Sequence, residues 1–269
     1  MTESEWLACT DPYRMVDYLS VFLRATGQTS DRKFRLFACA CCRRIWHLLA
    51  DERSRNAVEV AERHAESLAD TQEAELVDAA ANAACDDASA ALSAADADYG
   101  DTRDRASAAA FAAAQAAYSA AYAPCFLLRE PARAPIAAGH AACAVADNVV
   151  ACAASAEDAH ERAEFLFETA RKDEDAAQAR LLRDLFGPVL FRPLRLDPAW
   201  LTQDVVFLAQ AAYEERILPS GHLDLARLAV LADALEEAGC TDPELVAHLR
   251  GPGPHVRGCH AIDALLGKS

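Results

Sequence analysis

The stretch AAANAACDDASAALSAADADYGDTRDRASAAAFAAAQAAYSAAYA, residues 79–123, decides the fold class of this chain of 269 residues. Alanine occupies 23 of these 45 positions; it has the highest helix propensity, and its small side chain lets helix backbones approach closely. Four larger residues follow at steps of four, three and four and share one helical face: Phe111, Gln115, Tyr118 and Tyr122. The pattern favours a long antiparallel helical hairpin turning at Gly100 and Asp101. The alternative is a semi-ordered helical insertion with little tertiary role.

Helix start and stop signals recur along the rest of the chain. Thr2 and Glu5 have the spacing of a capping box, and Asp11 precedes a proline at a first helical position. We predict helices over residues 3–9, 12–26, 31–49, 52–69, 72–98, 102–122, 134–171, 174–186, 199–217, 222–238, 243–250 and 255–266. No sustained run alternates with the period of two that a strand needs. The sequence therefore predicts an all-α fold: a multi-helix bundle with a long alanine-rich helical hairpin and a small helical C-terminal lobe.

A proline-rich segment predicts the domain organisation. FGPVLFRPLRLDP, residues 186–198, contains three prolines and cannot form a helix. We expect an N-terminal helical bundle over residues 1–187, which includes the hairpin, and an extended connector over residues 188–198. A C-terminal helical lobe over residues 199–269 is expected to pack on the N-terminal helices.

The formal net charge of −16 restricts the possible partners. Residues 1–50 contain seven Lys and Arg against five Asp and Glu, whereas residues 51–100 contain three against thirteen. Nucleic acids and anionic membrane surfaces are bound through Lys and Arg side chains that displace counterions. The charge therefore argues against a nucleic-acid or membrane partner. It is compatible with a protein partner or a cation.

Cysteine content and the N-terminal residues indicate the compartment. MTESEW has neither the basic nor the apolar region of a signal peptide, and no run of about 18 apolar residues occurs. We therefore expect a cytoplasmic protein, in which the ten cysteines are free thiols or metal ligands rather than disulfides. Five lie among apolar or small residues and are expected in the core: Cys9, Cys85, Cys125, Cys143 and Cys152.

The segment ACACCRRIWH, residues 38–47, places a pair of thiols on one helix face. Cys41 shares the expected core face, whereas Cys39 and Cys42 lie one turn apart beside Arg35. A nearby cation lowers the pKa of a thiol and favours the thiolate that binds metal or attacks a substrate. Cys39 and Cys42 are therefore a candidate thiol pair. The alternative is that this face packs against a second helix.

The C-terminal block GCTDPELVAHLRGPGPHVRGCH, residues 239–260, contains the better metal candidate. Its ligand types are those of a tetrahedral zinc site: Cys240, His248, His255 and Cys259. His255 and Cys259 would lie one turn apart if the last helix began near His255. The spacing matches no compact zinc module. The alternative interpretation is that this block forms a tight turn with a capping histidine, which has a purely structural role.

Motifs typical of enzymes are missing from the sequence. It contains no glycine-rich phosphate loop, no Gly-x-Ser-x-Gly elbow and no His-Glu-x-x-His. Glu157 and His160 have the Glu-x-x-His spacing of di-iron bundles, but no second copy occurs. These absences favour a non-catalytic helical interaction or scaffold module with a protein partner. The alternative function is a zinc-binding or thiol-dependent protein that uses the C-terminal block.

Four blocks of the sequence resemble a group of uncharacterised paralogous proteins from planctomycete bacteria. They are MTESEWLACTDP, DRKFRLFACACCRRIWHLLADERSRNAVEVAERHA, LLRDLFGPVLFRPLRLDPAWLT and LADALEEAGCTDPELVAHLRGPGPHVRGCHAIDALLGK. His260 stands where the group usually has tryptophan, and ILPSGHLDLAR resembles an insertion. The resemblance implies two terminal signature blocks around a replaceable middle, and it implies no activity.

Overall fold

The protein is all-α in its computed structural model, which describes residues 1–26, 31–102, 104–128, 134–153, 159–192 and 194–268. The structure is 77% helical. Its α-helices are α1 (Glu3–Ala8), α2 (Pro12–Thr26), α3 (Asp31–Arg44), α4 (Glu52–Ala65), α5 (Thr71–Thr102), α6 (Arg105–Tyr122), α7 (Ala134–Ala153), α8 (Ala159–Phe186), α9 (Gln203–Glu214), α10 (Leu225–Glu237), α11 (Pro243–Leu249) and α12 (His260–Leu265). Within the described ranges, extended pairing is limited to isolated bridges from His222 to Ile217 and to Val256. The predicted fold class is confirmed.

The chain divides into two compact units. One unit comprises Thr10–Gln178, and the other combines Met1–Cys9 with Ala179–Ser269. We call them the hairpin unit and the C-terminal unit. This division differs from the expected one, because the first nine residues and the end of α8 belong to the C-terminal unit. None of the helices in the described ranges combines the length and apolar character that a bilayer crossing needs.

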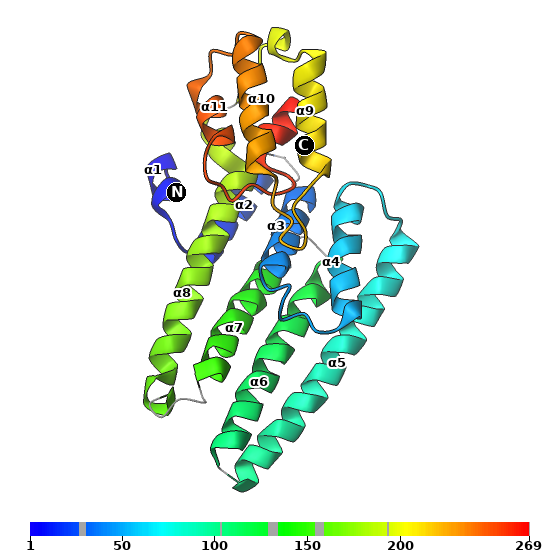
Figure 1. Cartoon of the computed structure of the whole chain (residues 1–269), viewed down its shortest axis with the longest axis vertical. Coiled ribbons are helices and arrows are strands. Elements are labelled where there is room, and N and C mark those ends of the chain that lie inside the picture. Colours follow the sequence, from blue (N-terminus) through cyan, green and yellow to red (C-terminus); the bar gives the residue numbers. More distant parts are fainter. Residues whose placement is uncertain (27–30, 103, 129–133, 154–158, 193, 269) are drawn as a thin grey trace. The chain divides into compact units, whose positions relative to one another are not determined.

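The alanine-rich helices α5 and α6 pack as a hairpin within the hairpin unit, and α6 also packs against α7 (Figure 1). Their interfaces are built from buried small side chains, including Ala81, Ala84, Ala116, Ala120, Ala141 and Ala142. Near the turn, the ring of Tyr99 on α5 stacks on that of Phe111 on α6, with centroids 6.0 Å apart. Since both helices are packed, the predicted hairpin is confirmed and the semi-ordered insertion is excluded. The predicted turn at Gly100 and Asp101 is wrong, because α5 continues through both residues to Thr102 and Asp104 caps α6.

Two bidentate ion pairs lie in the same unit. Arg43 on α3 donates from Nε and Nη2 to the two carboxylate oxygens of Glu62 on α4, at 2.6 and 2.8 Å. The next residue, Arg44, makes the equivalent pair with Glu174 of α8 at 2.8 and 2.7 Å. The side chains of Arg43 and Glu62 are only 3% and 6% exposed. Each charge therefore depends on its partner for the interactions that water supplies to an exposed group.

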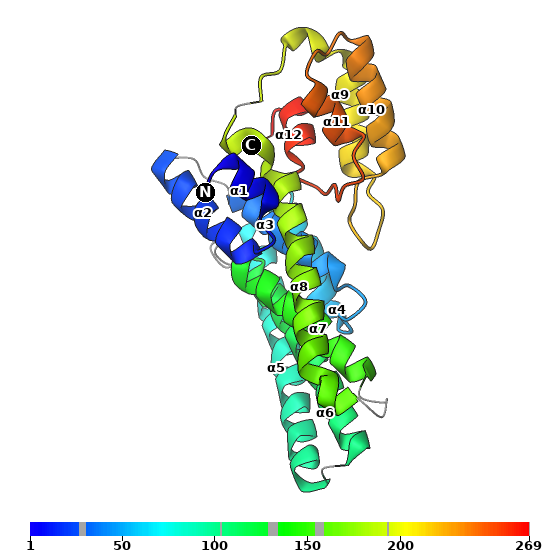
Figure 2. The same ribbon diagram turned by 90° about the vertical axis from the view of Figure 1, so that its left-hand side faces the viewer.

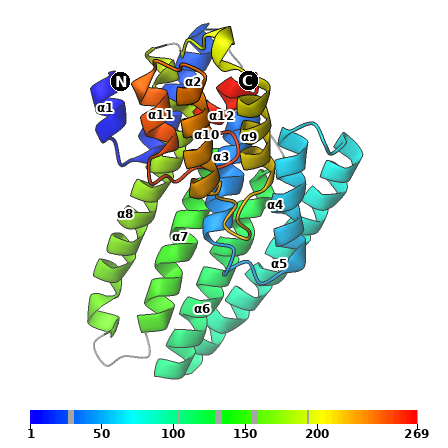
Figure 3. The same cartoon turned by 45° about the horizontal axis from the view of Figure 1, so that its top comes forward.

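The C-terminal unit is a small helical cluster around its own core. Helix α9 packs on α10, α10 on α11, and α12 lies against α9 and α11 (Figures 2 and 3). The centre is formed by large apolar side chains such as Val205, Leu228, Leu231, Leu249 and Ile262. Short 3₁₀ turns, η3 (Gly187–Leu190) and η4 (Pro198–Trp200), lie between α8 and α9. The proline-rich segment is thus non-α-helical, as its composition indicates.

Predicted helix boundaries are wrong in two regions that bear on the site. The sequence predicted one helix over residues 134–171 and another over residues 174–186, but α7 ends at Ala153 and α8 begins at Ala159. Helix α8 then runs without a break to Phe186, through the expected interruption at residues 172–173. Lys172 and Glu168 form an ion pair one turn apart (3.2 Å), which supports the continuous helix. The last helix begins at His260, not at His255, because the glycine and proline content of residues 251–258 favours a loop.

Replacing Glu62 with glutamine should destabilise the protein by about 3–5 kcal/mol, because the buried guanidinium of Arg43 would lose its countercharge. Chemical unfolding followed by circular dichroism measures the change. The matched control is Glu52→Gln, which breaks an exposed ion pair with Arg55 and should cost less than about 1 kcal/mol. Equal effects of the two substitutions would contradict this account.

Candidate functional site: a buried Asp–His–His–Cys group

The site begins with a carboxylate among buried apolar residues of a helix. Near the end of α8, Asp184 lies among the buried residues Leu181, Leu182, Leu185 and Phe186, and it is itself buried. Its Oδ2 accepts a hydrogen bond from the backbone N–H of Val256 at 2.9 Å. A buried carboxylate needs such partners, since leaving water is costly for a charge.

Helix α11 supplies the first imidazole. The helix starts sharply because Asp242 caps it with hydrogen bonds to the backbone N–H groups of Glu244 and Leu245, and Pro243 occupies the first turn. The apolar side chains of Leu245 and Leu249 anchor it in the core. His248 in the last turn places Nε2 at 3.3 Å from Oδ1 of Asp184.

The loop between α11 and α12 supplies the second imidazole. Gly253 has a positive φ of 79°, and a Cβ at this position would lie 2.8 Å from the backbone nitrogen of His255. Only glycine therefore fits this tight approach. His255 is buried, and its Nδ1 lies 2.9 Å from Oδ1 of Asp184. Its Nε2 lies 3.2 Å from the carbonyl oxygen of Gly251.

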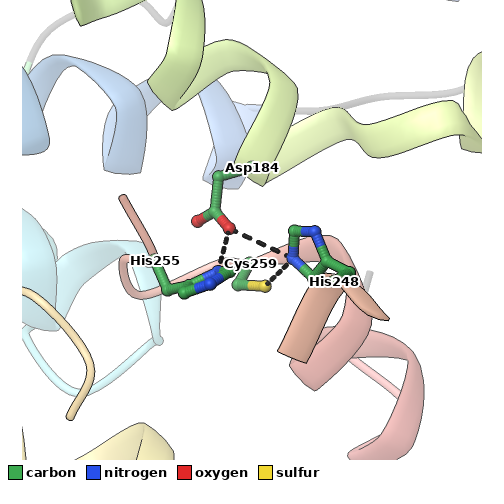
Figure 4. Close-up of side chains that lie close together, drawn as sticks. All are labelled: Asp184, His248, His255 and Cys259. Carbon is green, nitrogen blue, oxygen red and sulfur yellow. Dashed lines mark hydrogen bonds and ion pairs between the residues drawn. The ribbon is translucent and has the colours of Figure 1, made fainter. Parts of the chain in front are cut away.

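Cys259, the residue before α12, completes the group. Its thiol is fully buried, and Sγ lies 3.1 Å from Nε2 of His248. The four residues each offer one ligand atom, and these atoms all lie within 4.8 Å of one another. Figure 4 shows the four side chains converging from α8, α11 and the loop before α12. A buried His, Cys and Asp group of this kind is compatible with a metal ion.

The charges in the group depend on one another. Burial alone would raise the pKa of Asp184, but hydrogen bonds and charge interactions with His248 and His255 outweigh it and lower the pKa below its usual value. Burial alone would lower the pKa of His255, but the bond to Asp184, the charge of its carboxylate and the Gly251 carbonyl raise it. Asp184 is therefore ionised, and the surroundings favour positive charge at His255.

The hydrogen-bond partners of His255 also favour a positive charge on its ring. Both of its ring nitrogens face oxygen atoms that only accept, the Gly251 carbonyl and the Asp184 carboxylate. A neutral imidazole has a single N–H and satisfies one of them. If Nε2–H donates to Gly251, Nδ1 needs either a second proton or a metal ion. With a second proton or a metal ion at Nδ1 both oxygen atoms are satisfied, whereas a neutral ring leaves one of them without a donor.

The group differs from a catalytic Cys–His–Asp triad. In a triad the base uses one ring nitrogen for the nucleophile and the other for the carboxylate. Here Cys259 and Asp184 both approach the same atom, Nε2 of His248. Burial, and next the charge of Asp184, raise the pKa of the Cys259 thiol well above its usual value. The arrangement gives no support to nucleophilic catalysis by this thiol.

The structure brings together three of the four residues predicted as zinc ligands. Cys240 lies outside the group, because its half-buried thiol is near the backbone oxygen of Asp242 at 3.9 Å. The fourth residue of the group is Asp184, which was not among the predicted ligands. His260 lies beside the group, and its Nδ1–H donates to the backbone carbonyl of Asp184 at 2.9 Å.

The candidate thiol pair of α3 lies in the core of the hairpin unit. Cys39 and Cys42 are buried, as is Cys41. Burial, the largest influence on each, raises the pKa of the Cys39 and Cys42 thiols. The charge of Arg35 lowers the pKa of Cys39, as expected, but burial outweighs it. The guanidinium of Arg35 donates to the carbonyl of Leu127 at 3.0 Å. Glu157 and the side chain of His160, considered for a di-iron site, lie outside the described residues.

Comparison with known proteins gives no relative from which a function can be taken. The chain matches no family model, no curated protein and no solved structure. Only the geometry of the site therefore bears on the function of this protein.

Cys39, Cys41 and Cys42 should resist alkylation by iodoacetamide in the native protein at about pH 8, because buried thiols of raised pKa form little thiolate. Peptide mass spectrometry after timed labelling identifies the modified positions. The half-buried Cys9 and Cys240 are internal controls and should label first, and denaturant should make all five reactive. Labelling of Cys39 or Cys42 as fast as Cys240 would refute the assignment to the core.

Asp184→Asn should destabilise chelator-treated protein by about 3–5 kcal/mol, because it removes the charge that His255 faces. The lowered pKa of Asp184 gives stability that is present above about pH 4 and is lost as the pH falls through the folded-state pKa. The raised pKa of His255 gives stability that is present below about pH 6.5 and is lost as the pH rises through its folded-state pKa.

The difference in unfolding free energy between the wild type and Asp184→Asn should therefore be largest between about pH 4 and 6.5. Urea titrations at several pH values measure it. Asp233→Asn, at an exposed carboxylate paired with Arg250, is the control and should show a small difference at every pH. A difference that grows steadily above pH 7 would contradict the charge assignment.

Proposed function

We propose that the protein is a zinc-binding helical protein in which one Zn²⁺ ion organises the C-terminal unit. The ligand atoms would be Oδ1 of Asp184, Nε2 of His248, Nδ1 of His255 and Sγ of Cys259. The observation that carries the proposal is the convergence of these four buried atoms within 4.8 Å. Two nitrogen or oxygen ligands of a tetrahedral zinc ion, each about 2.0–2.1 Å from the metal, lie about 3.4 Å apart. The distance of 3.3 Å from Nε2 of His248 to Oδ1 of Asp184 is close to that value. Nδ1 of His255 lies 2.9 Å from the same oxygen, so this pair would move apart by about 0.5 Å when a zinc ion binds.

The donor types favour zinc over the hard divalent cations. Magnesium and calcium prefer six or more oxygen ligands, whereas thiolate and imidazole suit zinc. A bound zinc ion would also deprotonate the thiol of Cys259, because the charge of a metal reverses the effect of burial on the pKa. The ion would place a cation at Nδ1 of His255 while Nε2–H donates to the carbonyl of Gly251.

A structural role fits this set of ligands better than a catalytic one. Structural zinc sites use four protein ligands, whereas catalytic sites leave one position for water or substrate. The ligands join the end of α8, α11 and the loop before α12. Gly251 and Val256 supply the supporting hydrogen bonds, which orient His255 and Asp184. Such contacts are typical of the surroundings of metal ligands.

The interaction or scaffold module stays a prediction, with one observation in its favour. Helices α9 and α10, which pack on each other, expose the large apolar side chains of Phe207 (71%) and Val230 (51%). Exposed apolar side chains of this size favour a surface for a protein partner. A structural zinc ion in the same unit is compatible with that role.

Protein purified without chelators should contain about one equivalent of zinc per chain by elemental mass spectrometry. Asp184→Asn, His255→Gln and Cys259→Ser should each bring the zinc content below about a tenth of an equivalent, because structural sites need their full set of ligands. Cys240→Ser and His47→Ala are matched controls outside the group and should retain the metal. Circular dichroism verifies that each variant is folded.

Cobalt substitution adds a readout that does not depend on stability. Co²⁺ in a tetrahedral site with a thiolate ligand absorbs visible light and gives a sulfur-to-metal charge-transfer band. Cys259→Ser should lose that band, and Cys240→Ser should keep it. Wild-type protein without zinc, or a band that depends on Cys240 instead, would refute the proposed site.

A further inference from the structure

A cleft of about 930 Å³ opens within the C-terminal unit. Its walls come from α1, the end of α8, α11 and the loop of residues 251–255. Ligand sites for small molecules usually measure about 300–1,000 Å³, so the cleft is large enough for one. The buried Asp–His–His–Cys group touches it through Asp184, His248 and His255.

Most charged side chains that line the cleft are already compensated. Arg192 forms ion pairs with Glu3 at 2.6 Å and with Glu244 at 2.8 Å. The carboxylate of Asp242 caps α11, and that of Asp184 faces His248 and His255. These groups hold the walls of the cleft together, and they leave little charge for a ligand.

Two arginines of α8 are different. Arg183 is half-buried and donates from Nη1 to the backbone carbonyls of Trp6 and Cys9, at 3.4 and 2.7 Å, which are neutral acceptors. Arg180, one turn earlier, is exposed and makes no hydrogen bond or ion pair with any residue that the structure describes. Burial, and next the charge of Arg180, lower the pKa of Arg183. The chain has a net charge of −16, yet these two arginines of the cleft form no ion pair with a carboxylate in the described structure.

The rest of the lining is suited to an apolar group. Leu7 is 57% exposed at the surface of the cleft, and Leu194 and Pro188 are partly buried beside it. Like charges one turn apart destabilise a helix, so the arginine pair has a cost that a bound anion would remove. Uncompensated cations beside apolar side chains are complementary to an amphipathic anion.

We propose that this cleft binds a small organic anion. The acidic group, a carboxylate or a phosphate, pairs with the guanidinium groups of Arg180 and Arg183, and an apolar body lies against Leu7 and its neighbours. The proposal rests on the cleft and its arginines alone, and it holds whether or not a metal occupies the neighbouring group.

Isothermal titration calorimetry with the full chain tests the proposal, using octyl phosphate and octanoate as probes. Octanol and octylammonium have the same apolar body without the negative charge. Both anions should bind at least about tenfold more tightly than these two compounds, since a charged hydrogen bond is worth about one order of magnitude or more. The tighter of the two anions identifies the acidic group as phosphate or carboxylate.

Arg180→Gln should weaken binding of the preferred anion about tenfold, and Arg180→Lys should restore much of it, because the charge returns. Arg180 is exposed and unpaired in the described structure, so neither change should lower the thermal midpoint, and Arg180→Gln should raise it slightly because the repulsion from Arg183 is removed. Arg227→Gln is the matched control on α10, where the arginine pairs with Glu215 away from the cleft lining.

A second variant tests the apolar wall. Leu7→Asp places a carboxylate beside the bound anion and should abolish binding, whereas Leu7→Ala should weaken it less. Failure of both anions to bind, equal binding of octylammonium, or equal losses in Arg180→Gln and Arg227→Gln would overturn the proposal. Zinc content, measured on the same samples, distinguishes loss of the metal site from failure of the cleft.

Discussion

The carboxylate of Asp184 is removed from water at the end of α8, and the C-terminal unit is arranged so that its charge is satisfied. One oxygen accepts from the backbone of Val256, and the other faces the imidazoles of His248 and His255. The backbone carbonyl of the same residue receives a hydrogen bond from His260. A single residue thereby connects α8, α11, the loop after it and α12. Without that charge, both imidazoles would lose a partner that orients them, and the buried His255 would lose the carboxylate that raises its pKa.

The helices and the hairpin could be predicted because their signals are local. These signals are alanine content, capping residues such as Thr2 and Asp11, and helical steps between large side chains. Each of them acts within a few residues. The break assigned to residues 172–173 was wrong because no glycine or proline interrupts that segment, and α8 continues through it to Phe186. Local signals also led us to extend the last helix to His255. There the competing preference of the Gly-Pro-Gly-Pro segment for a loop prevails.

Three of the four grouped side chains were selected because histidine and cysteine are rare and stand close together in the C-terminal block. Asp184 was missed because it lies more than sixty residues earlier, and aspartate is common in this acidic chain. The sequence nevertheless contains a signal that points to Asp184. In the stretch LLRDLF, Asp184 directly precedes two apolar residues of the core-facing stripe, and a charge beside such a stripe needs a partner. Cys240 is of a residue type that binds zinc. Its position depends on the tertiary structure, however, which holds its thiol near the backbone oxygen of Asp242.

The last two turns of α8 carry one charge that neighbouring side chains compensate and two that they do not. Asp184 points into the group where two imidazoles compensate it, and the ring of His260 packs so closely on Gly187 that a Cβ there would lie 2.4 Å from the imidazole. On the same segment, Arg180 and Arg183 line the cleft without a carboxylate to neutralise them. A helix selected for stability alone would pair these arginines with acids, which this chain has in excess. Their isolation beside an apolar wall therefore argues for a ligand that carries the missing negative charge.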